Sequence, residues 1–380
     1  MTYYHLNARL LAPMMIQKNR QSNAPGGLPY LPGSTLRGAI AGACLRNGEP
    51  PESTGFRTVF LDRPVCFPDL LPSKDPDRPG RPLPITAATC KRSPGFSQEK
   101  GHGVHDVLAA FASEREGGPV SATFTCKSCT HDIEPFEGFW NGNLANPQNN
   151  EPVRVYHRHT SIDRRTGTAA SSSFYFTQGI SETWKGTDNR YHPQYLSNGI
   201  YLDDDQFDIL SGWLSEPIFV GADRTRGMGE ITLALTETQP PAFDLEAWND
   251  SFMKKLSALT SKPPVQGVFF SIELTSHTIL VDKFLRPSLS FMPDFPDTAI
   301  DMQMIRPQTV RGWQNSWQLP KPEDTAIAMG SVYLCRYTGD NIDGLKRYLN
   351  RLTAEGVGLR RPEGFGWVIV CDPFHIQEVI

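Results

Sequence analysis

Two glycine-rich stretches of this chain share one pattern, and this repetition constrains the fold more than any other feature of the sequence. Residues 221–231 (GADRTRGMGEI) and 358–368 (GLRRPEGFGWV) both fit G-x-x-R-x-x-G-[M/F]-G-x-[I/V], at a constant offset of 137 positions. Each stretch follows an amphipathic helical pattern and precedes an apolar strand pattern. The sequence therefore predicts a duplicated α/β unit.

The first strand patterns of the two copies begin about 264 positions apart, almost twice the offset of the loops, so the first copy carries extra residues. Prolines recur and helical periodicity is scarce between about 50 and 200, which indicates insertions there. We expect an α+β fold of two ferredoxin-like domains, with a large insertion in the first. The predicted divisions are an N-terminal domain at 1–240, a linker helix at 241–265 and a C-terminal domain at 266–380.

The residue types of the two loops suit a bound phosphate. Glycine allows backbone amides to approach a ligand closely, and successive exposed amides attract anions. Arginine adds a charge and a fork of donors that matches phosphate. We therefore expect nucleic-acid contacts at Arg224, Arg226, Gly227 and Gly229 in the first loop, and at Arg360, Arg361, Gly364 and Gly366 in the second. The alternative is a pair of tight turns required only by sheet packing.

Residues 30–46 (YLPGSTLRGAIAGACLR) read as a Pro-Gly turn followed by a short helix. Ser34 is the expected N-cap residue, because its hydroxyl can accept a bond from an amide of the first turn. A glycine-opened helix start with a nearby arginine is also suited to a phosphate. We expect RNA contacts at Gly33, Ser34 and Arg37, and the alternative is an ordinary capped helix packed on a sheet.

The chain has seven cysteines, and three of them form a pattern typical of a metal site. Cys126 and Cys129 are a C-x2-C pair in a loop-rich region, and Cys90 precedes them. Three thiolates and one imidazole would hold a tetrahedral structural zinc, which would stabilise an irregular insertion. The predicted ligands are Cys90, His102, Cys126 and Cys129, with His105 and His131 as open alternatives to His102.

Residues 153–176 predict an extended β-hairpin around the turn DRRTG. The segment is the most basic of the chain, and aromatic groups alternate with its charges, as single-stranded RNA binding favours. The expected RNA contacts are Arg154, Arg158, Arg164 and Arg165. Solvated surface charge is the alternative, and His157 and His159 could instead act as acid and base in RNA cleavage.

The net charge is −4 and the pI is about 6.2, which argues against a protein that coats nucleic acid through bulk charge. Any RNA surface must therefore be narrow. The longest apolar runs fall far short of the ~20 residues of a membrane span, and the N-terminus carries no signal-peptide pattern. We expect a cytoplasmic protein.

Taken together, these motifs resemble the RAMP superfamily of CRISPR-associated proteins. The resemblance rests on residues 33–38 (GSTLRG), 162–168 (IDRRTGT) and the two glycine-rich loops. A narrower resemblance, to the large two-domain RAMP subunit of type III-D effector complexes, rests on segments spread along the chain: 30–39 (YLPGSTLRGA), 82–86 (PLPIT) with Cys90, 102–106 (HGVHD), 312–314 (GWQ) and 319–321 (LPK).

The resemblance implies two RRM-like domains, with a hairpin thumb on the first. It implies a non-catalytic subunit that holds the 5′ handle of the CRISPR RNA and caps the backbone of the complex. The implied partners are CRISPR RNA, backbone RAMP subunits and the large polymerase/cyclase-type subunit, with target RNA contacted indirectly. The alternative function is a metal-independent endoribonuclease that processes CRISPR precursor RNA, with His5, His157 or His159 as its base.

Overall fold

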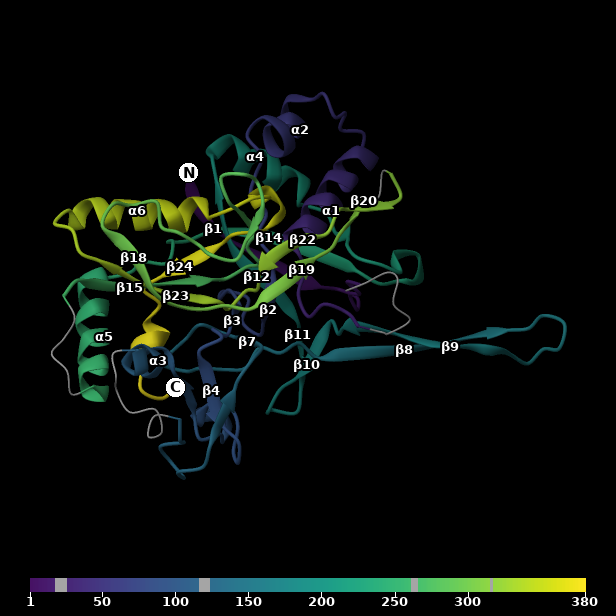
Figure 1. Cartoon of the computed structure of the whole chain (residues 1–380). Helices are drawn as coiled ribbons and strands as arrows, with labels where there is room; N and C mark the ends of the chain where they lie inside the picture. The colour runs from purple at the N-terminus through teal and green to yellow at the C-terminus, as the bar shows by residue number, and fades with distance from the viewer. Residues whose placement is uncertain (18–25, 116–123, 261–265, 315–316) are drawn as a thin grey trace. The chain divides into compact units, whose positions relative to one another are not determined.

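The computed structural model of the chain describes residues 1–17, 26–115, 124–260, 266–314 and 317–380. These ranges form a mixed α/β structure with six α-helices and many antiparallel strands (Figure 1). Contacts between α-carbons divide it into two compact units, each built from two stretches of chain. The first unit is Met1–Gly80 with Asn150–Gln239, and the second is Arg81–Asn149 with Pro240–Ile380.

A five-stranded antiparallel sheet forms the centre of the first unit. Its order is β13-β14-β1-β12-β2, with bounds β13 (Ile218–Phe219), β14 (Glu230–Glu237), β1 (Thr2–Leu10), β12 (Tyr195–Leu202) and β2 (Leu71–Ser73). Tyr4, Leu6, Ala8 and Leu10 alternate along β1 and all belong to the core of this unit. That period of two places them on one face of the strand.

The helices of the first unit are α1 (Gly33–Arg46), α2 (Thr54–Arg57), continued by a π-helical turn (Thr58–Asp62), and α4 (Asp204–Trp213). Leu36, Ile40 and Cys44 recur every four residues along α1 and are buried in the core. The predicted cap at Ser34 is wrong, because Pro32 holds the N-cap position and Ser34 lies inside the first turn. Helix α4 begins with a capping box between Asp203 and Gln206, and Asp204 and Asp205 lie in its first turn.

Two antiparallel ribbons complete the first unit: β8 (Arg154–Ile162) with β9 (Ala169–Ile180), and β10 (Thr183–Lys185) with β11 (Tyr191–Pro193). The β8–β9 ribbon is the predicted basic hairpin, which is called the first hairpin below. Figure 1 shows it as a long two-stranded arm that extends away from the sheet of its unit. Its return strand is fixed at the base, where Met14 and Ile180 exchange two backbone hydrogen bonds of 2.9 and 2.7 Å.

The second unit has a four-stranded antiparallel sheet of order β18-β23-β15-β24. The bounds are β15 (Val268–Leu274), β18 (Thr298–Met304), β23 (Val332–Tyr337) and β24 (Val368–Val370), and helix α6 (Ile342–Glu355) precedes β24. No α-helix lies between β15 and β18, a stretch that is described throughout. Two further ladders belong to this unit: β16 (Leu280–Val281) with β17 (Pro287–Ser288), and β19 (Pro307–Val310) with β22 (Asp324–Ile327), extended by β20 (Trp313–Gln314) and β21 (Leu319–Pro320).

Helix α5 (Leu245–Leu259) lies where a linker helix is predicted, and its packing is that of a core element. Leu245, Trp248, Phe252 and Leu256 form one apolar stripe, buried in the same core as β15 and α6. The reason is the width of that stripe, since four large side chains exposed to water would be costly. Residues 261–265 of the predicted linker lie outside the described residues.

The segment Arg81–Asn149 packs within the second unit, although it interrupts the first in sequence. It holds short strands and one helix: β3 (Arg81–Pro82), β4 (Ala87–Cys90), β5 (Val104–Asp106), β6 (Ile133–Pro135), β7 (Phe139–Trp140), a 3-10 turn (Ser97–Glu99) and α3 (Leu108–Arg115). Leu108 and Ala112 of α3 are buried beside α5, and Trp140 lies 5.5 Å from Phe374 of the C-terminal 3-10 turn (Pro373–Ile376). The insertion predicted at 50–200 is thus divided between the units by its packing, while domain boundaries at 240 and 266 stay a prediction.

Candidate nucleic-acid interface and metal centre

The two glycine-rich loops have the same backbone conformation. Gly221 and Gly358 have φ of 78° and 79°, and Gly229 and Gly366 have φ of 80° and 82°. Between them lie the 3-10 turns Arg224–Arg226 and Arg361–Glu363, each preceded by a residue in the left-handed region. A Cβ atom at Gly229 or Gly366 would collide with a backbone carbonyl of its own unit. Glycine is therefore required at these positions by the turn itself.

The hydrogen bonds of the loops repeat as well. In the first loop the amide of Ala222 donates to Met15 O (2.9 Å) and that of Gly229 to Pro13 O (2.8 Å). In the second loop the corresponding amides donate to carbonyls 264 positions further on, Leu359 N to Ile279 O (2.9 Å) and Gly366 N to His277 O (3.0 Å).

 The two copies thus agree in both offsets, 137 for the loops and 264 for the segments whose carbonyls they bond. The duplication predicted from the sequence is present in the backbone.

These hydrogen bonds also decide how the loop amides are used. Gly227 N donates to Arg224 O and Gly364 N to Arg361 O, at 3.3 and 3.0 Å. The amides of all four glycines named as RNA contacts therefore bond carbonyls of the protein and are not free for a phosphate. The tight-turn alternative accounts for the glycines, and a ligand would have to be held by the arginine side chains.

The arginines of the two loops differ in their surroundings. Arg224 and Arg226 of the first loop are exposed, and Arg226 pairs with Asp223 at 3.4 Å. Arg360 of the second loop is held between Asp324 (2.5 Å) and Glu363 (2.8 Å). Arg224 and Arg226 of the first loop are thus exposed to solvent, whereas Arg360 of the second loop forms ion pairs within its unit.

Glu363 is the centre of this ion-pair network, since Lys321 also bonds it at 2.6 Å. Burial by itself raises the pKa of Glu363, but Arg360 and Lys321 outweigh burial and lower that pKa to about 2. Arg361 is half-buried and donates to Glu355 O at 2.9 Å. The charged side chains of the second loop therefore bond groups of their own unit and stabilise its structure.

The start of α1 is filled by groups of the protein. Gly33 N donates to the buried Asp69 carboxylate at 2.8 Å. Burial raises the pKa of Asp69 to about 7, and the Gly33 hydrogen bond only partly offsets it. Arg37 donates to Phe60 O at 2.9 Å, and its guanidinium lies 5.5 Å from the Phe60 ring centre. Ser34 is half-buried in the first turn. A phosphate at this helix start would have to compete with Asp69.

The first hairpin presents a face of arginine and aromatic side chains to solvent. Tyr156 is 57% exposed and Phe176 is 40% exposed, with their ring centres 6.3 Å apart. Arg158 lies opposite Phe176 in the register and is exposed. At the turn, Arg164 and Arg165 are also exposed. Charges that can reach phosphates and rings that can stack on bases therefore share one surface.

Arg154 lies at the base of the hairpin and is used differently. It donates to Gly27 O at 3.3 Å and pairs with Glu151 at 3.2 Å, and its side chain is half-buried. Three of the four arginines predicted to contact RNA on the hairpin are thus exposed, and the fourth fixes the arm to its unit.

The histidines of the ribonuclease alternative are not arranged around a common point. The alternation of the strand puts His157 and His159 on the face opposite Tyr156 and Arg158, and His159 bonds the Thr177 hydroxyl at 3.1 Å. His5 is buried in β1, where its ring lies 2.9 Å from Pro76 O, and burial lowers its pKa. None of these three rings is presented on the exposed face of the hairpin.

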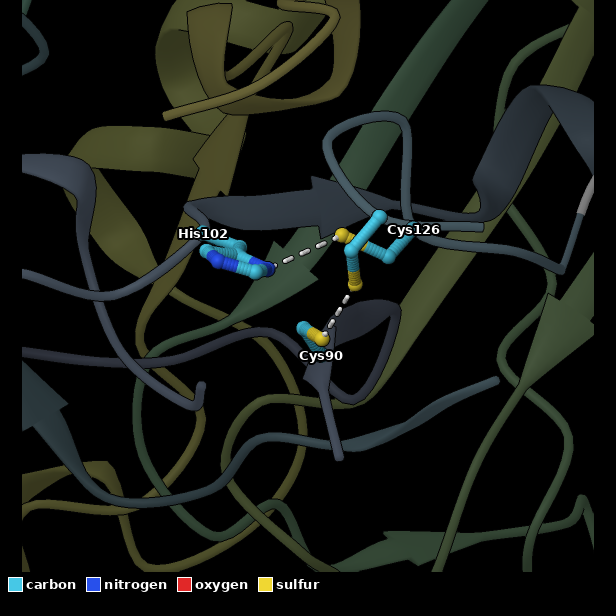
Figure 2. A group of neighbouring side chains, drawn as sticks. Cys90, His102 and Cys126 are labelled. Carbon is cyan, nitrogen blue, oxygen red and sulfur yellow. Dashed lines mark hydrogen bonds between the residues drawn. The ribbon is translucent and has the colours of Figure 1, made fainter. Parts of the chain in front are cut away.

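The four predicted metal ligands come together in the second unit. The ligand atoms of Cys90, His102, Cys126 and Cys129 all lie within 4.8 Å of one another. The sulfurs of Cys90 and Cys129 are 3.4 Å apart, and Cys126 Sγ is 3.7 Å from His102 Nδ1. Figure 2 shows the His102 ring and Cys126 turned toward each other, with Cys90 beside them. In a tetrahedral site with zinc–sulfur bonds of about 2.3 Å, two sulfurs lie about 3.8 Å apart, so the set fits a metal of this kind.

Each ligand comes from a loop or strand end of the insertion. Cys90 ends β4, and Cys126 and Cys129 lie in one turn before β6, where Cys126 N donates to His131 O at 2.7 Å. Burial raises the pKa of Cys90, but backbone amides of Ser93 and Arg92 and the neighbouring side chains outweigh it and lower that pKa to about 6. A thiolate is the form that binds metal.

The two alternative histidines lie outside the cluster. His105 is in β5, buried, and burial lowers its pKa. The ring of His131 bonds Cys129 O at 2.9 Å. His102 is therefore the histidine that the fold supplies to the cluster.

No protein-family model matches the sequence, and no curated protein matches it. Among solved structures, the chain is similar to a chain of the type III-B Cmr-beta complex bound to cognate target RNA and AMPPnP, with 13% identity, a TM-score of 0.45, and coverage of 90% of this chain and 88% of the other. It is also similar to a chain of the Csm3-Csm4 subcomplex of a type III-A CRISPR-Cas interference complex, with 9% identity, a TM-score of 0.35, and coverage of 90% and 94%. A third similar structure is oligomeric Cmr4 from Pyrococcus furiosus, with 12% identity, a TM-score of 0.26, and coverage of 63% of this chain and 99% of the other.

Among the described residues, no helix has both the length and the apolar character needed to cross a membrane.

Proposed function

We propose that this chain is a non-catalytic RNA-binding subunit of the RAMP superfamily, which holds the 5′ handle of a CRISPR RNA and caps the backbone of a type III interference complex. Its partners in that role are backbone RAMP subunits and the large polymerase/cyclase-type subunit. The type III-D assignment rests on the sequence segments that resemble that subunit.

Strand order supports two ferredoxin-like domains. In the first unit the chain runs β1-α1-β2, then β12-α4-β14, and the sheet order is β14-β1-β12-β2 with β13 at the edge. This is a β-α-β-β-α-β arrangement in an antiparallel sheet. The sheet of the second unit, β24-β15-β23-β18, follows the same order with α6 before the last strand.

The exposed face of the first hairpin is the observation that carries the RNA-binding proposal. The ring centres of Tyr156 and Phe176 are 6.3 Å apart, and Arg158 lies directly opposite Phe176 in the register. Arg164 and Arg165 extend the positive charge to the tip of the arm. A narrow surface of this kind binds a single strand even though the whole chain is acidic.

We further propose that the Cys90–His102–Cys126–Cys129 cluster holds one structural zinc. The support is the donor set, with three thiols and one imidazole, and the spacing of the atoms. A bound zinc would cross-link β4, the residue 102 loop and the C-x2-C turn, which have few large side chains of their own to pack together.

The proposal is tested by the salt dependence of RNA binding. The Arg158→Ala, Arg164→Ala, Arg165→Ala triple variant should bind a fluorescein-labelled repeat-derived RNA more weakly than the wild type. The slope of log K against log salt should fall by about 2, since each lost phosphate contact on a single strand removes about 0.7. The matched control is Arg347→Ala, which removes an exposed arginine from α6. Equal slopes for the triple variant and the wild type would contradict the proposal.

A cleavage assay with the same RNA tests the ribonuclease alternative. Incubation of the wild type with repeat-derived RNA in EDTA should leave the RNA intact. Cleavage at one site, lost in His157→Ala or His159→Ala, would establish the enzyme instead.

A further inference from the structure

A second hairpin, residues 307–327, lies in the second unit where the first hairpin lies in the first. Each hairpin is inserted between the second and third strands of its unit, between β2 and β12 in one case and between β18 and β23 in the other. The second hairpin consists of the β19–β22 ladder and its extension β20–β21.

The bases of the two hairpins are fixed by equivalent bonds. Ile327 ends the return strand of the second hairpin and exchanges backbone hydrogen bonds of 2.9 and 2.8 Å with Thr278. Ile180 makes the same pair of bonds with Met14 in the first unit. Thr278 follows Met14 by 264 positions, the offset that also relates the carbonyls bonded by the two glycine-rich loops. The second hairpin is therefore the counterpart of the first within the duplicated unit.

The tip of the second hairpin carries large exposed apolar side chains. Trp317 is 74% exposed and Leu319 is 57% exposed. Leu319 pairs with Gln314 at the end of the β20–β21 ladder, and Trp317 lies in the turn beyond that pair. Residues 315–316 lie outside the described residues. An indole ring in this setting can stack on a nucleic-acid base without regard to sequence.

The rest of the hairpin is held firmly. Val310 and Ala326 are buried with Ile279, and Asp324 bonds Arg360 of the second glycine-rich loop at 2.5 Å. Lys321 bonds Glu363 of the same loop at 2.6 Å. A preorganised arm loses less conformational entropy when it binds, so a single stacking contact contributes more.

The second hairpin also carries an exposed arginine, Arg311, whose side chain can bind a phosphate. Arg311 pairs with Glu323 at 2.7 Å, and both side chains are at least half exposed. Exposed pairs of this kind contribute little to stability, so exchange of Glu323 for a phosphate costs little. The second hairpin thus carries an exposed aromatic ring and an exposed arginine, the two kinds of side chain that the first hairpin also exposes.

We propose that the second hairpin is a second RNA-contacting arm, in which Trp317 stacks on an unpaired base. This inference rests on the proposed function, because it assigns a further contact to the same ligand. It assigns to single-stranded RNA a part of the chain outside the basic hairpin and the glycine-rich loops.

The test compares Trp317→Ala with Trp317→Phe in the full chain, using a fluorescein-labelled repeat-derived RNA. Trp317→Ala should weaken binding roughly 5- to 100-fold, the range of one lost stacking contact, and Trp317→Phe should retain most of the affinity. The salt slope should not change in either variant, since no phosphate contact is lost. Tyr191→Ala is the matched control, because Tyr191 is also 74% exposed but lies on the β10–β11 ribbon.

Stacking has a direct optical readout as well. RNA should quench tryptophan fluorescence in the wild type more than in Trp317→Phe. Unchanged affinity and unchanged quenching in the Trp317 variants would overturn the inference, and so would loss of association with a protein subunit at unchanged RNA affinity. If the hairpin arginine variant loses RNA binding and Trp317→Ala does not, the proposed function stands and only this inference fails. If the wild type does not bind the RNA, the proposed function fails first.

Discussion

At the scale of single residues, two glycines of the first loop show that positive φ and lack of space for a side chain are separate reasons for glycine. Gly227 and Gly229 are two positions apart, and both have positive φ. A Cβ atom at Gly227 would meet nothing within 4 Å, whereas one at Gly229 would collide with Val220 O. The two positions therefore differ in steric room while sharing the left-handed conformation.

This difference predicts unequal effects of alanine. Gly227→Ala should destabilise the protein by about 1–2 kcal/mol, the strain of a left-handed alanine. Gly229→Ala should cost roughly 2–5 kcal/mol, because a collision adds to that strain. Urea unfolding of both variants measures the difference, and equal losses of stability would contradict the steric argument.

At the scale of elements, α5 shows how a predicted linker becomes part of a core. Two proline pairs bracket the helix in sequence, which favours a connector. Its stripe nevertheless packs against β15, where Phe252 lies 5.7 Å from Phe269 and is fully buried. The Trp248 indole also donates to Asp372 O at 2.9 Å. The helix therefore contributes to the stability of the second unit.

The prediction for this element contrasts a buried and an exposed residue of the helix. Phe252→Ala should lower the free energy of unfolding by about 3–5 kcal/mol, since a large buried ring leaves a cavity. Asp250→Ala, at an exposed position of the same helix, should change it by less than about 0.5 kcal/mol. If α5 were a free linker, both variants would behave alike in thermal unfolding.

At the scale of the whole molecule, the second unit combines two distant stretches of chain, and the candidate metal centre lies in one of them. Buried Asp106 and His375 link these stretches, with a distance of 3.2 Å between the carboxylate and the ring. Arg81 and Asp372 form a further link at 2.8 Å. The insertion is therefore tied to the C-terminal part of the chain by packing and by buried polar contacts.

Metal removal should act on this unit. The native protein should contain one zinc per chain by elemental mass spectrometry, and chelation should increase hydrogen exchange in β4, β5 and α3 while β1 and β14 keep their protection. His102→Ala should lose the metal and His131→Ala should keep it. A metal content that follows His131 instead, or no metal in either variant, would contradict the assignment.

The sequence by itself determined the features that depend on local chemistry and on repetition. It predicted the duplicated loops, the basic hairpin and the four members of the cysteine–histidine cluster. Glycine at positive φ, alternation with a period of two and the spacing of a C-x2-C pair are all set by neighbouring residues, so they can be read without knowledge of the fold.

Only the tertiary structure decided which of the predicted phosphate-binding amides and arginines are already bonded to other groups of the protein. Asp69 bonds the first amide of α1 from 36 residues away, Arg360 is held by Asp324, and amides of both glycine-rich loops bond carbonyls of segments distant in sequence. It also decided that Arg81–Asn149 packs with the second unit and that a second hairpin matches the first. These outcomes depend on contacts between residues far apart in the chain, which no local pattern records.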